Sequence, residues 1–251
     1  MKITAVMGSP TKDGNTCVLA REVLRGAADA GAEVDEIFLA EHRIEFCRGC
    51  ISRNMTTNCM ASGACVIPDD VNALRRRLYE SDGIVLASPS YGIKPTARMK
   101  NFIVDRIGMY TAYTSGLGGK YFVGVSTCGG IGAERVAREL AEDFVAGFHR
   151  RGYSTGSIGV KLGRDRIEER PEELAKAYRL GRRLVEDIQM ERKYPFQKLF
   201  DRAMTALVVR RLILRNIYQN REGMMRAVYD NLLERGLIRP AGNGHGGSQY
   251  V

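Results

Sequence analysis

Four cysteines, Cys47, Cys50, Cys59 and Cys65, lie within nineteen residues with the spacing C-x2-C-x8-C-x5-C. The chain shows no cleavable leader, so we expect a cytoplasmic protein with reduced thiols, in which clustered cysteines serve as metal ligands, redox groups or buried thiols. Four thiolates suit a 4Fe–4S cluster or a structural zinc ion. A redox-silent loop with buried thiols is the third interpretation.

A second chemical signal is the stretch VMGSPTKDGNT, residues 6–16. It differs from a Walker A loop, because five residues separate Gly8 from Gly14 and Asn15 replaces the lysine; the dinucleotide fingerprint G-x-G-x-x-G is also absent. Hydroxyl and amide side chains precede the start of a helix, where unpaired N–H groups favour an anion. The loop therefore suits a single terminal phosphate, and the alternative is an ordinary helix cap. The candidate ligands are Ser9, Thr11, Asn15 and Thr16.

Two further loops carry residues suited to a flat ligand. In SPSYGIKPTARMKNFIVDR, residues 88–106, a turn after an apolar run exposes Tyr91. In STCGGIGAE, residues 126–134, Gly129 and Gly130 allow backbone N–H groups to approach a ligand closely. The alternatives are an aromatic ring packed on its own surface and a flexible linker.

These loops follow short apolar runs that alternate with helical patterns. Such alternation predicts an α/β fold with a doubly wound parallel sheet, and five strands favour the flavodoxin-like order 2-1-3-4-5. Ligands of such sheets bind beyond the carboxyl ends of the strands, where the three loops would lie. The expected strands are 2–7, 33–39, 83–88, 120–127 and 153–160, and the expected helices are 15–30, 70–80, 96–112 and 133–150.

Charge separates the end of the chain from the rest. The 251 residues are 44% hydrophobic and carry a net charge of +9, yet residues 1–150 contain 18 basic and 17 acidic side chains. Residues 192–239 contain 11 basic and 4 acidic side chains. No segment approaches the roughly 20 apolar residues of a membrane span.

The basic segment, residues 191–240, predicts a helical extension with helices near 196–218 and 221–235 that ends at Gly236. We expect these helices to pack on the core of the same or a neighbouring subunit and to help cover the ligand. Anionic lipid or an acidic protein is the alternative target. Nucleic acid is not expected, because no nucleic-acid module is visible. The glycine-rich residues 241–251 are expected to be disordered.

Taken together, the three loops resemble the NADPH-dependent FMN reductase and iron–sulfur flavoprotein group of the flavodoxin-like superfamily. GSPTKDGNT is similar to its phosphate loop, SPSYGIKPTARMKNFIVDR to its S-P-x-Y segment and STCGGIGAE to its T-x-G-G-x-G loop. Val104 is an extra residue before Asp105 and Arg106, which leaves their helical phase open. The resemblance covers roughly residues 1–190 and implies a flavodoxin-like FMN-binding domain there, with residues 47–65 as a cysteine-rich insertion.

The resemblance implies that Ser9, Thr11, Asn15 and Thr16 hold the phosphate of FMN. It places one group of residues beside the isoalloxazine ring, namely Pro89, Ser90, Tyr91 and Gly92, and a second group along its other edge, namely Thr127, Cys128, Gly129 and Gly130. It also favours a 4Fe–4S cluster over zinc for the cysteines, although the family spacing is C-x2-C-x2-C and six extra residues stand here between Cys50 and Cys59.

Two functions are therefore expected. One is an FMN-dependent oxidoreductase that takes electrons from NADPH or NADH and passes them to a quinone, a flavin, a metal ion or another small acceptor. The other is an iron–sulfur flavoprotein that carries electrons between a ferredoxin-like protein and an acceptor. A homodimer or homotetramer is expected in both cases.

Overall fold

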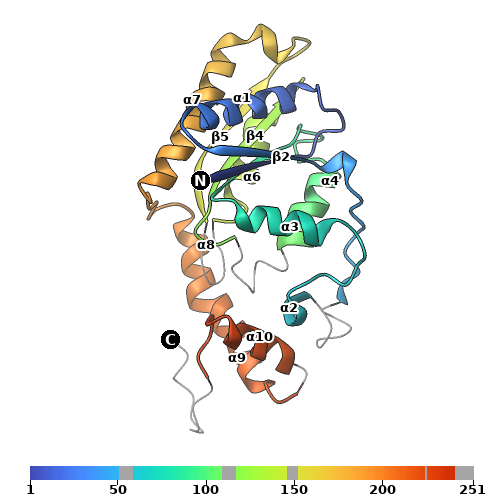
Figure 1. Ribbon diagram of the computed structural model, residues 1–251, viewed down its shortest axis with the longest axis vertical. Coiled ribbons are helices and arrows are strands. Elements are labelled where there is room, and N and C mark those ends of the chain that lie inside the picture. The colour runs from blue at the N-terminus through green and yellow to red at the C-terminus, as the bar shows by residue number, and fades with distance from the viewer. Residues whose placement is uncertain (51–58, 109–116, 146–151, 224, 241–251) are drawn as a thin grey trace.

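Five parallel strands form one sheet in the order β2-β1-β3-β4-β5, which confirms the predicted order. The structure is a computed structural model that describes residues 1–50, 59–108, 117–145, 152–223 and 225–240 (Figure 1). The interior strands are apolar on both faces, as expected for a parallel sheet covered by helices. The strands are β1 (Lys2–Met7), β2 (Glu33–Phe38), β3 (Gly83–Ala87), β4 (Tyr121–Cys128) and β5 (Tyr153–Lys161).

Helices cover both faces of this sheet (Figure 1). One core, between the sheet and the pair α1 and α7, includes Val23, Leu184 and Val185. The other, between the sheet and α3, α6 and the helix after β3, includes Leu74, Phe102 and Leu140. The α-helices of the core are α1 (Asn15–Asp29), α3 (Val71–Glu80), α4 (Ala97–Lys100), α6 (Ala133–Glu142) and α7 (Pro171–Gln189), with short 3-10 turns at η1 (Leu39–Glu41) and η4 (Ile167–Glu169).

Helix α7 is absent from the sequence-based prediction. Its start nevertheless carries recognisable signals, because Pro171 occupies the first turn and Glu172 and Glu173 follow it. It packs on α1 through small residues on both helices: a Cβ atom on Gly181 would lie 1.9 Å from the carbonyl oxygen of Val23, and one on Gly26 would lie 2.0 Å from that of Tyr178. The two helices approach so closely because both contact positions lack a side chain.

Gly181→Ala is therefore expected to lower the free energy of unfolding by about 2–3 kcal/mol, the upper part of the range for overpacking in a core. Thermal unfolding measured by circular dichroism checks this value. The matched control is Gly223→Ala, because a Cβ atom there would meet nothing nearer than the Asn220 carbonyl oxygen at 3.8 Å. Equal melting temperatures for the two variants would contradict the contact.

The helix expected over 96–112 begins as α4 and continues as a π-helical segment, η3 (Asn101–Gly108). A π-turn takes up one more residue than an α-turn. The residue in excess of the family pattern, Val104, is 43% exposed, whereas Arg106 is 4% exposed. The wider turn thus absorbs the insertion and leaves Arg106 in the interior. Residues 109–112 of the expected helix, and residues 146–150 of the helix expected over 133–150, lie outside the described residues.

The C-terminal helices extend away from the sheet and turn back near the cysteine segment (Figure 1). They are α8 (Leu199–Met204), the π-helical η5 (Thr205–Val209), α9 (Arg210–Gln219) and α10 (Arg226–Glu234). Gly236 follows α10 in the left-handed region, with a φ of 65°, and ends the helical segment near the predicted stop. Residues 241–251, expected to be disordered, lie outside the described residues.

Helices α9 and α10 enclose a small apolar core of their own, the tail cluster, which is separate from the two cores of the sheet. Helix α10 also contacts α2 (Cys59–Ser62), and Cys59 packs against the tail cluster. Phe196 and Phe200, by contrast, are 83% and 77% exposed. Within one chain, the apolar side chains of the tail are therefore buried only in its α9–α10 part. Packing of the remaining tail residues on a neighbouring subunit stays a prediction. The tail cluster consists of Leu214, Ile217, Tyr218, Met225, Val228, Leu232 and Ile238.

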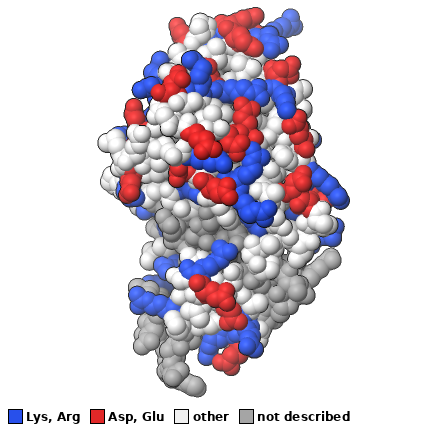
Figure 2. All heavy atoms as spheres, in the orientation of Figure 1, with Lys and Arg blue, Asp and Glu red and all other residues white. Residues whose placement is uncertain are grey.

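Acidic and basic side chains are interspersed over the α/β core on the face shown in Figure 2, in keeping with the balanced charge of residues 1–150. In the tail, Lys198 pairs with Glu142 of the core at 3.1 Å. None of the described helices combines the length and the apolar character that a membrane crossing requires.

Candidate functional site

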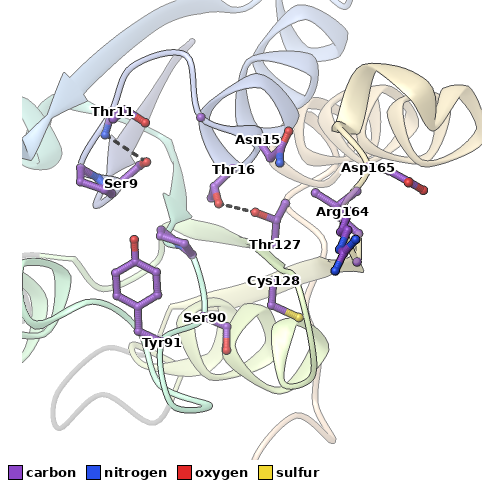
Figure 3. Close-up of a pocket in the computed structure, with 16 residues that line it drawn as sticks. Ser9, Thr11, Asn15, Thr16, Ser90, Tyr91, Thr127, Cys128, Arg164 and Asp165 are labelled. Atoms are coloured by element: carbon purple, nitrogen blue, oxygen red, sulfur yellow. Dashed lines mark hydrogen bonds between the residues drawn. The ribbon is translucent and has the colours of Figure 1, made fainter.

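A pocket of about 330 Å³ lies at the carboxyl ends of β1, β3, β4 and β5 (Figure 3). Its volume falls in the range of about 300–1,000 Å³ that is usual for small-molecule sites. Of the twelve residues proposed from the three loops, all but Gly92 and Gly130 line it. The residues that do are Ser9, Thr11, Asn15, Thr16, Pro89, Ser90, Tyr91, Thr127, Cys128 and Gly129.

The first loop is held by contacts to the helix that follows it. Helix α1 starts at Asn15 with Gly14 as its N-cap and without a side-chain cap, so its first N–H groups are available to a ligand. The Thr11 N–H donates to Ser9 Oγ at 3.4 Å, and Cys17 Sγ donates to the Thr11 carbonyl at 3.4 Å. Burial raises the pKa of the Cys17 thiol, which keeps that group a neutral donor.

Asn15 and Thr16 link this loop to the 3-10 turn η4 and to strand β4. The side-chain oxygen of Asn15 accepts a hydrogen bond from the Ile167 N–H at 3.0 Å. The amide nitrogen of Asn15 then remains as a donor beside the pocket. Thr16 Oγ1 and Thr127 Oγ1 lie 2.6 Å apart in a buried hydrogen bond, drawn as a dashed line in Figure 3. One of these two hydroxyls keeps its hydrogen for another acceptor.

The second loop presents Tyr91 on a tight turn. Tyr91 and Lys94 exchange backbone hydrogen bonds of 2.9 and 3.1 Å, and the two residues between them, Gly92 and Ile93, have φ angles of 58° and 61°. A β-branched residue is rare in this region, so Ile93 stores strain of about 1–3 kcal/mol. The strained turn leaves Tyr91 59% exposed at the rim of the pocket.

Ser90 supplies a polar atom that the protein itself does not satisfy. Its Oγ is buried and has no hydrogen-bond partner among the described residues, although its N–H donates to the Thr127 carbonyl at 3.0 Å. Buried polar groups in proteins are nearly always paired, so an orphaned hydroxyl in a pocket wall indicates a ligand. Gly132 permits this arrangement: it has a φ of 101°, and a Cβ atom there would lie 2.9 Å from Ile93 Cγ2 and 3.0 Å from Ser90 Oγ.

One wall of the pocket, formed by residues 162–165 after β5, contains no residue that was proposed from the sequence. Asp165 pairs with Arg170 at 2.6 Å, whereas Arg164 is exposed and has no acidic partner among the described residues. In Figure 3, Arg164 and Asp165 lie across the Thr16–Thr127 contact from Ser9, Thr11 and Tyr91. The rule that ligands bind beyond the carboxyl ends of parallel strands, applied to the fifth strand as well, would have found Arg164. No tail residue is among those that line the pocket in the described part of the chain.

The four clustered cysteines meet at a second cavity of about 250 Å³. Cys47, Cys50, Cys59 and Cys65 all line it, together with Val66, Ile67, Asp105 and Arg106 among others. Among the residues that the structure describes, no three His, Cys, Asp or Glu side chains lie close enough together to bind one metal ion. The thiols surround a space instead of meeting at one point.

Two of these cysteines are anchored from different directions. The backbone of Cys65 is held by Asn72 of α3, which accepts from its N–H and donates to its carbonyl, both at 2.8 Å. Cys59 belongs to α2 and packs on the tail cluster. Burial, followed by the nearby Cys65, raises the pKa of the Cys59 thiol. The Gly49 N–H donates to Cys47 Sγ at 3.5 Å.

The sheet order and the pocket at its carboxyl edge define a flavodoxin-like α/β protein with a ligand site where that fold binds its ligand. The model of the NADPH-dependent FMN reductase family matches residues 1–159, and the chain belongs to that family.

Two relatives are named iron–sulfur flavoproteins. One, from Archaeoglobus fulgidus, is 33% identical over 240 residues, which cover 95% of this chain and 100% of that protein. The other, MJ1083 from Methanocaldococcus jannaschii, is 37% identical over 133 residues, or 52% of this chain and 65% of that protein. A solved flavone reductase shares the fold with a TM-score of 0.56 and 20% identity, over 75% of this chain and 63% of that one.

Proposed function

We propose that the chain binds FMN in the pocket at the carboxyl edge of the sheet and acts as an FMN-dependent oxidoreductase. The observation that carries the proposal is the union of three loops, distant in sequence, around one pocket whose buried Ser90 hydroxyl lacks a partner. When bound, FMN accepts a hydride or electrons and passes them to an acceptor. The protein binds and orients it.

The phosphate of FMN would occupy the start of α1. Ser9, Thr11 and Thr16 supply hydroxyls there, and Asn15 supplies its amide N–H groups, because its oxygen is engaged by Ile167. The dipole of α1 favours the negative charge. Arg164, across the pocket, would add a positive charge that the sequence-based proposal lacked.

The isoalloxazine ring would lie between the second and third loops. Pro89, Ser90 and Tyr91 border one side, and Gly92 contributes by holding the turn that presents Tyr91. Thr127, Cys128 and Gly129 line the other edge, where backbone N–H groups at 127–130 would stabilise negative charge on the reduced ring.

We infer that the cysteine cavity holds a 4Fe–4S cluster. Four thiols, two apolar side chains and N–H donors to sulfur are the surroundings that such clusters require. The names of the relatives from Archaeoglobus fulgidus and Methanocaldococcus jannaschii, both iron–sulfur flavoproteins, support a cluster over zinc. Cys47, Cys50, Cys59 and Cys65 are the proposed ligands.

NADPH or NADH is the proposed donor, and a quinone, a flavin, a metal ion or another small molecule the acceptor. The cysteine cavity supports a second candidate, in which the protein relays electrons between a ferredoxin-like protein and an acceptor and the basic tail docks the acidic partner. The exposed Phe196 and Phe200 support assembly into a homodimer or homotetramer, which size-exclusion chromatography with light scattering would test.

Purification without air, followed by an absorption spectrum, tests the cofactors. Heat should release FMN, identified by chromatography; release of FAD, or no flavin even after reconstitution, would refute the proposal. Steady-state oxidation of NADPH or NADH with a quinone or ferricyanide separates the two functions. Turnover supports the oxidoreductase, and reduction by ferredoxin alone supports the carrier.

Asn15→Asp tests the phosphate position with little change in shape. A carboxylate still accepts the hydrogen bond from Ile167, but it places a negative charge beside the phosphate dianion. We expect FMN affinity to fall by at least about tenfold, or about 1.4 kcal/mol. Riboflavin, which lacks the phosphate, is the matched control ligand and should bind the variant and the wild type equally. Equal losses for both ligands, measured by flavin fluorescence, would contradict the placement.

A further inference from the structure

A buried ion pair forms part of the wall of the cysteine cavity. Arg106 Nη1 lies 2.7 Å from Asp69 Oδ2, and Arg106 Nη2 lies 3.1 Å from Asp69 Oδ1. The two side chains are 1% and 0% exposed. Each charge is thus neutralised by its partner, which removes the main cost of burying a lone charge.

The same guanidinium also contacts both stretches of chain that carry cysteines. Arg106 Nη2 donates to Cys65 Sγ at 3.3 Å, and Nη1 donates to the carbonyl of Glu45, two residues before Cys47. Asp69 accepts from the N–H groups of Glu45 at 3.0 Å and Val71 at 3.2 Å. Removal of Arg106 would therefore leave the bonds of Asp69 with Glu45 and of Asp70 with Arg43 between the segment before Cys47 and the segment after Cys65, and it would take the donor away from Cys65 Sγ.

Arg106 is in position because η3 is π-helical. The insertion at Val104 would turn the following residues away from the interior in a regular α-helix, and the wider turn restores their phase. The Asn101 amide, at the start of the same segment, donates to the Glu45 carbonyl at 3.4 Å. The segment that begins at the Tyr91 turn thus ends at Arg106, which contacts the sulfur of Cys65.

We propose that Arg106 is a positioning residue of the cysteine site, which fixes Cys65 and raises the reduction potential of the metal group bound there. This inference rests on the proposed cluster. An N–H donor to a ligating sulfur stabilises the more negative, reduced state. A planar guanidinium can serve Asp69 and Cys65 at the same time, whereas a lysine ammonium lacks that fork.

The test compares Arg106→Lys with wild type in the full-length protein prepared without air. Iron and acid-labile sulfide are measured first, and the midpoint potential is then determined by a titration followed by electron paramagnetic resonance. We expect Arg106→Lys to bind FMN, to retain iron and to show a lower potential. Loss of iron from this variant with FMN retained also supports the proposal.

Arg77→Lys is the matched control. Arg77 forms the same forked pair with Asp35, at 2.7 and 3.1 Å, away from the cysteine cavity. The midpoint potential and the iron content of the Arg77→Lys variant should equal those of the wild type. Asp69→Asn should shift the midpoint potential in the opposite direction to Arg106→Lys. It removes the negative charge that compensates Arg106, so the potential should rise.

An unchanged potential in iron-loaded Arg106→Lys, or an equal shift in Arg77→Lys, would overturn the inference alone. A wild type without iron, even after reconstitution with iron and sulfide, would overturn the proposed cluster and this inference with it.

Discussion

The Cys59→Ser variant, purified without air, is expected to contain bound FMN and to have lost nearly all of its iron. Cys59 lines the cysteine cavity, whereas the pocket proposed for FMN is lined by other residues. A cluster held by four thiolates is not retained well by three, because serine is a poor ligand for iron at neutral pH. Iron, sulfide and flavin, each determined per chain, check the expectation.

Cys17→Ser is the matched control for a lost thiol. Cys17 is also buried, but its sulfur donates to the Thr11 carbonyl in the first loop, and a serine hydroxyl can make the same kind of bond. This variant should keep its iron. If Cys59→Ser and wild type contain equal iron, Cys59 is not a ligand and the four-cysteine site is wrong.

The strands could be predicted because each interior strand is a short apolar run bounded by turn residues. Their order could be predicted because five strands that alternate with helices favour the flavodoxin-like topology. Phosphate-loop residues could be proposed from a similar local signal, since side chains with hydroxyl groups lie directly before a helix. Helix α7 and the wall at Arg164 were missed for different reasons. The start of α7 carries Pro171 and two glutamates but no side-chain cap. A single exposed arginine forms no motif of its own, so only its position after the fifth strand indicates Arg164.

The π-helical segment shows what a linear pattern cannot supply. One extra residue, Val104, could either rotate Arg106 out of the interior or be absorbed by a wider turn. The choice depends on a partner 37 residues earlier in the chain, the buried carboxylate of Asp69. The six extra residues between Cys50 and Cys59 pose the same problem. The four cysteines reach one cavity because Asn72 holds Cys65 and the tail cluster packs against Cys59.

The tail was expected to help cover the flavin, yet in this chain it lies against the cysteine segment. Val228 of α10 has no exposed surface and belongs to the tail cluster, against which Cys59 packs. We therefore expect Val228→Asp to reduce the iron content severalfold and to leave FMN content close to that of the wild type. A carboxylate buried without a partner costs several kcal/mol, so the tail cluster should open and release α2.

Leu212→Asp is the matched control, since Leu212 lies in the same tail but is 61% exposed. It adds the same charge without opening the tail cluster and should leave iron and FMN unchanged. Both variants lower the net charge of the tail by the same amount. Weaker binding to anionic vesicles in both variants would therefore be an effect of surface charge, whereas loss of iron in Val228→Asp alone would be an effect of opening the tail cluster. If Val228→Asp loses FMN in proportion to iron, the tail also supports the flavin pocket, as first expected. If it keeps both, contact between α10 and α2 does not hold Cys59 in place.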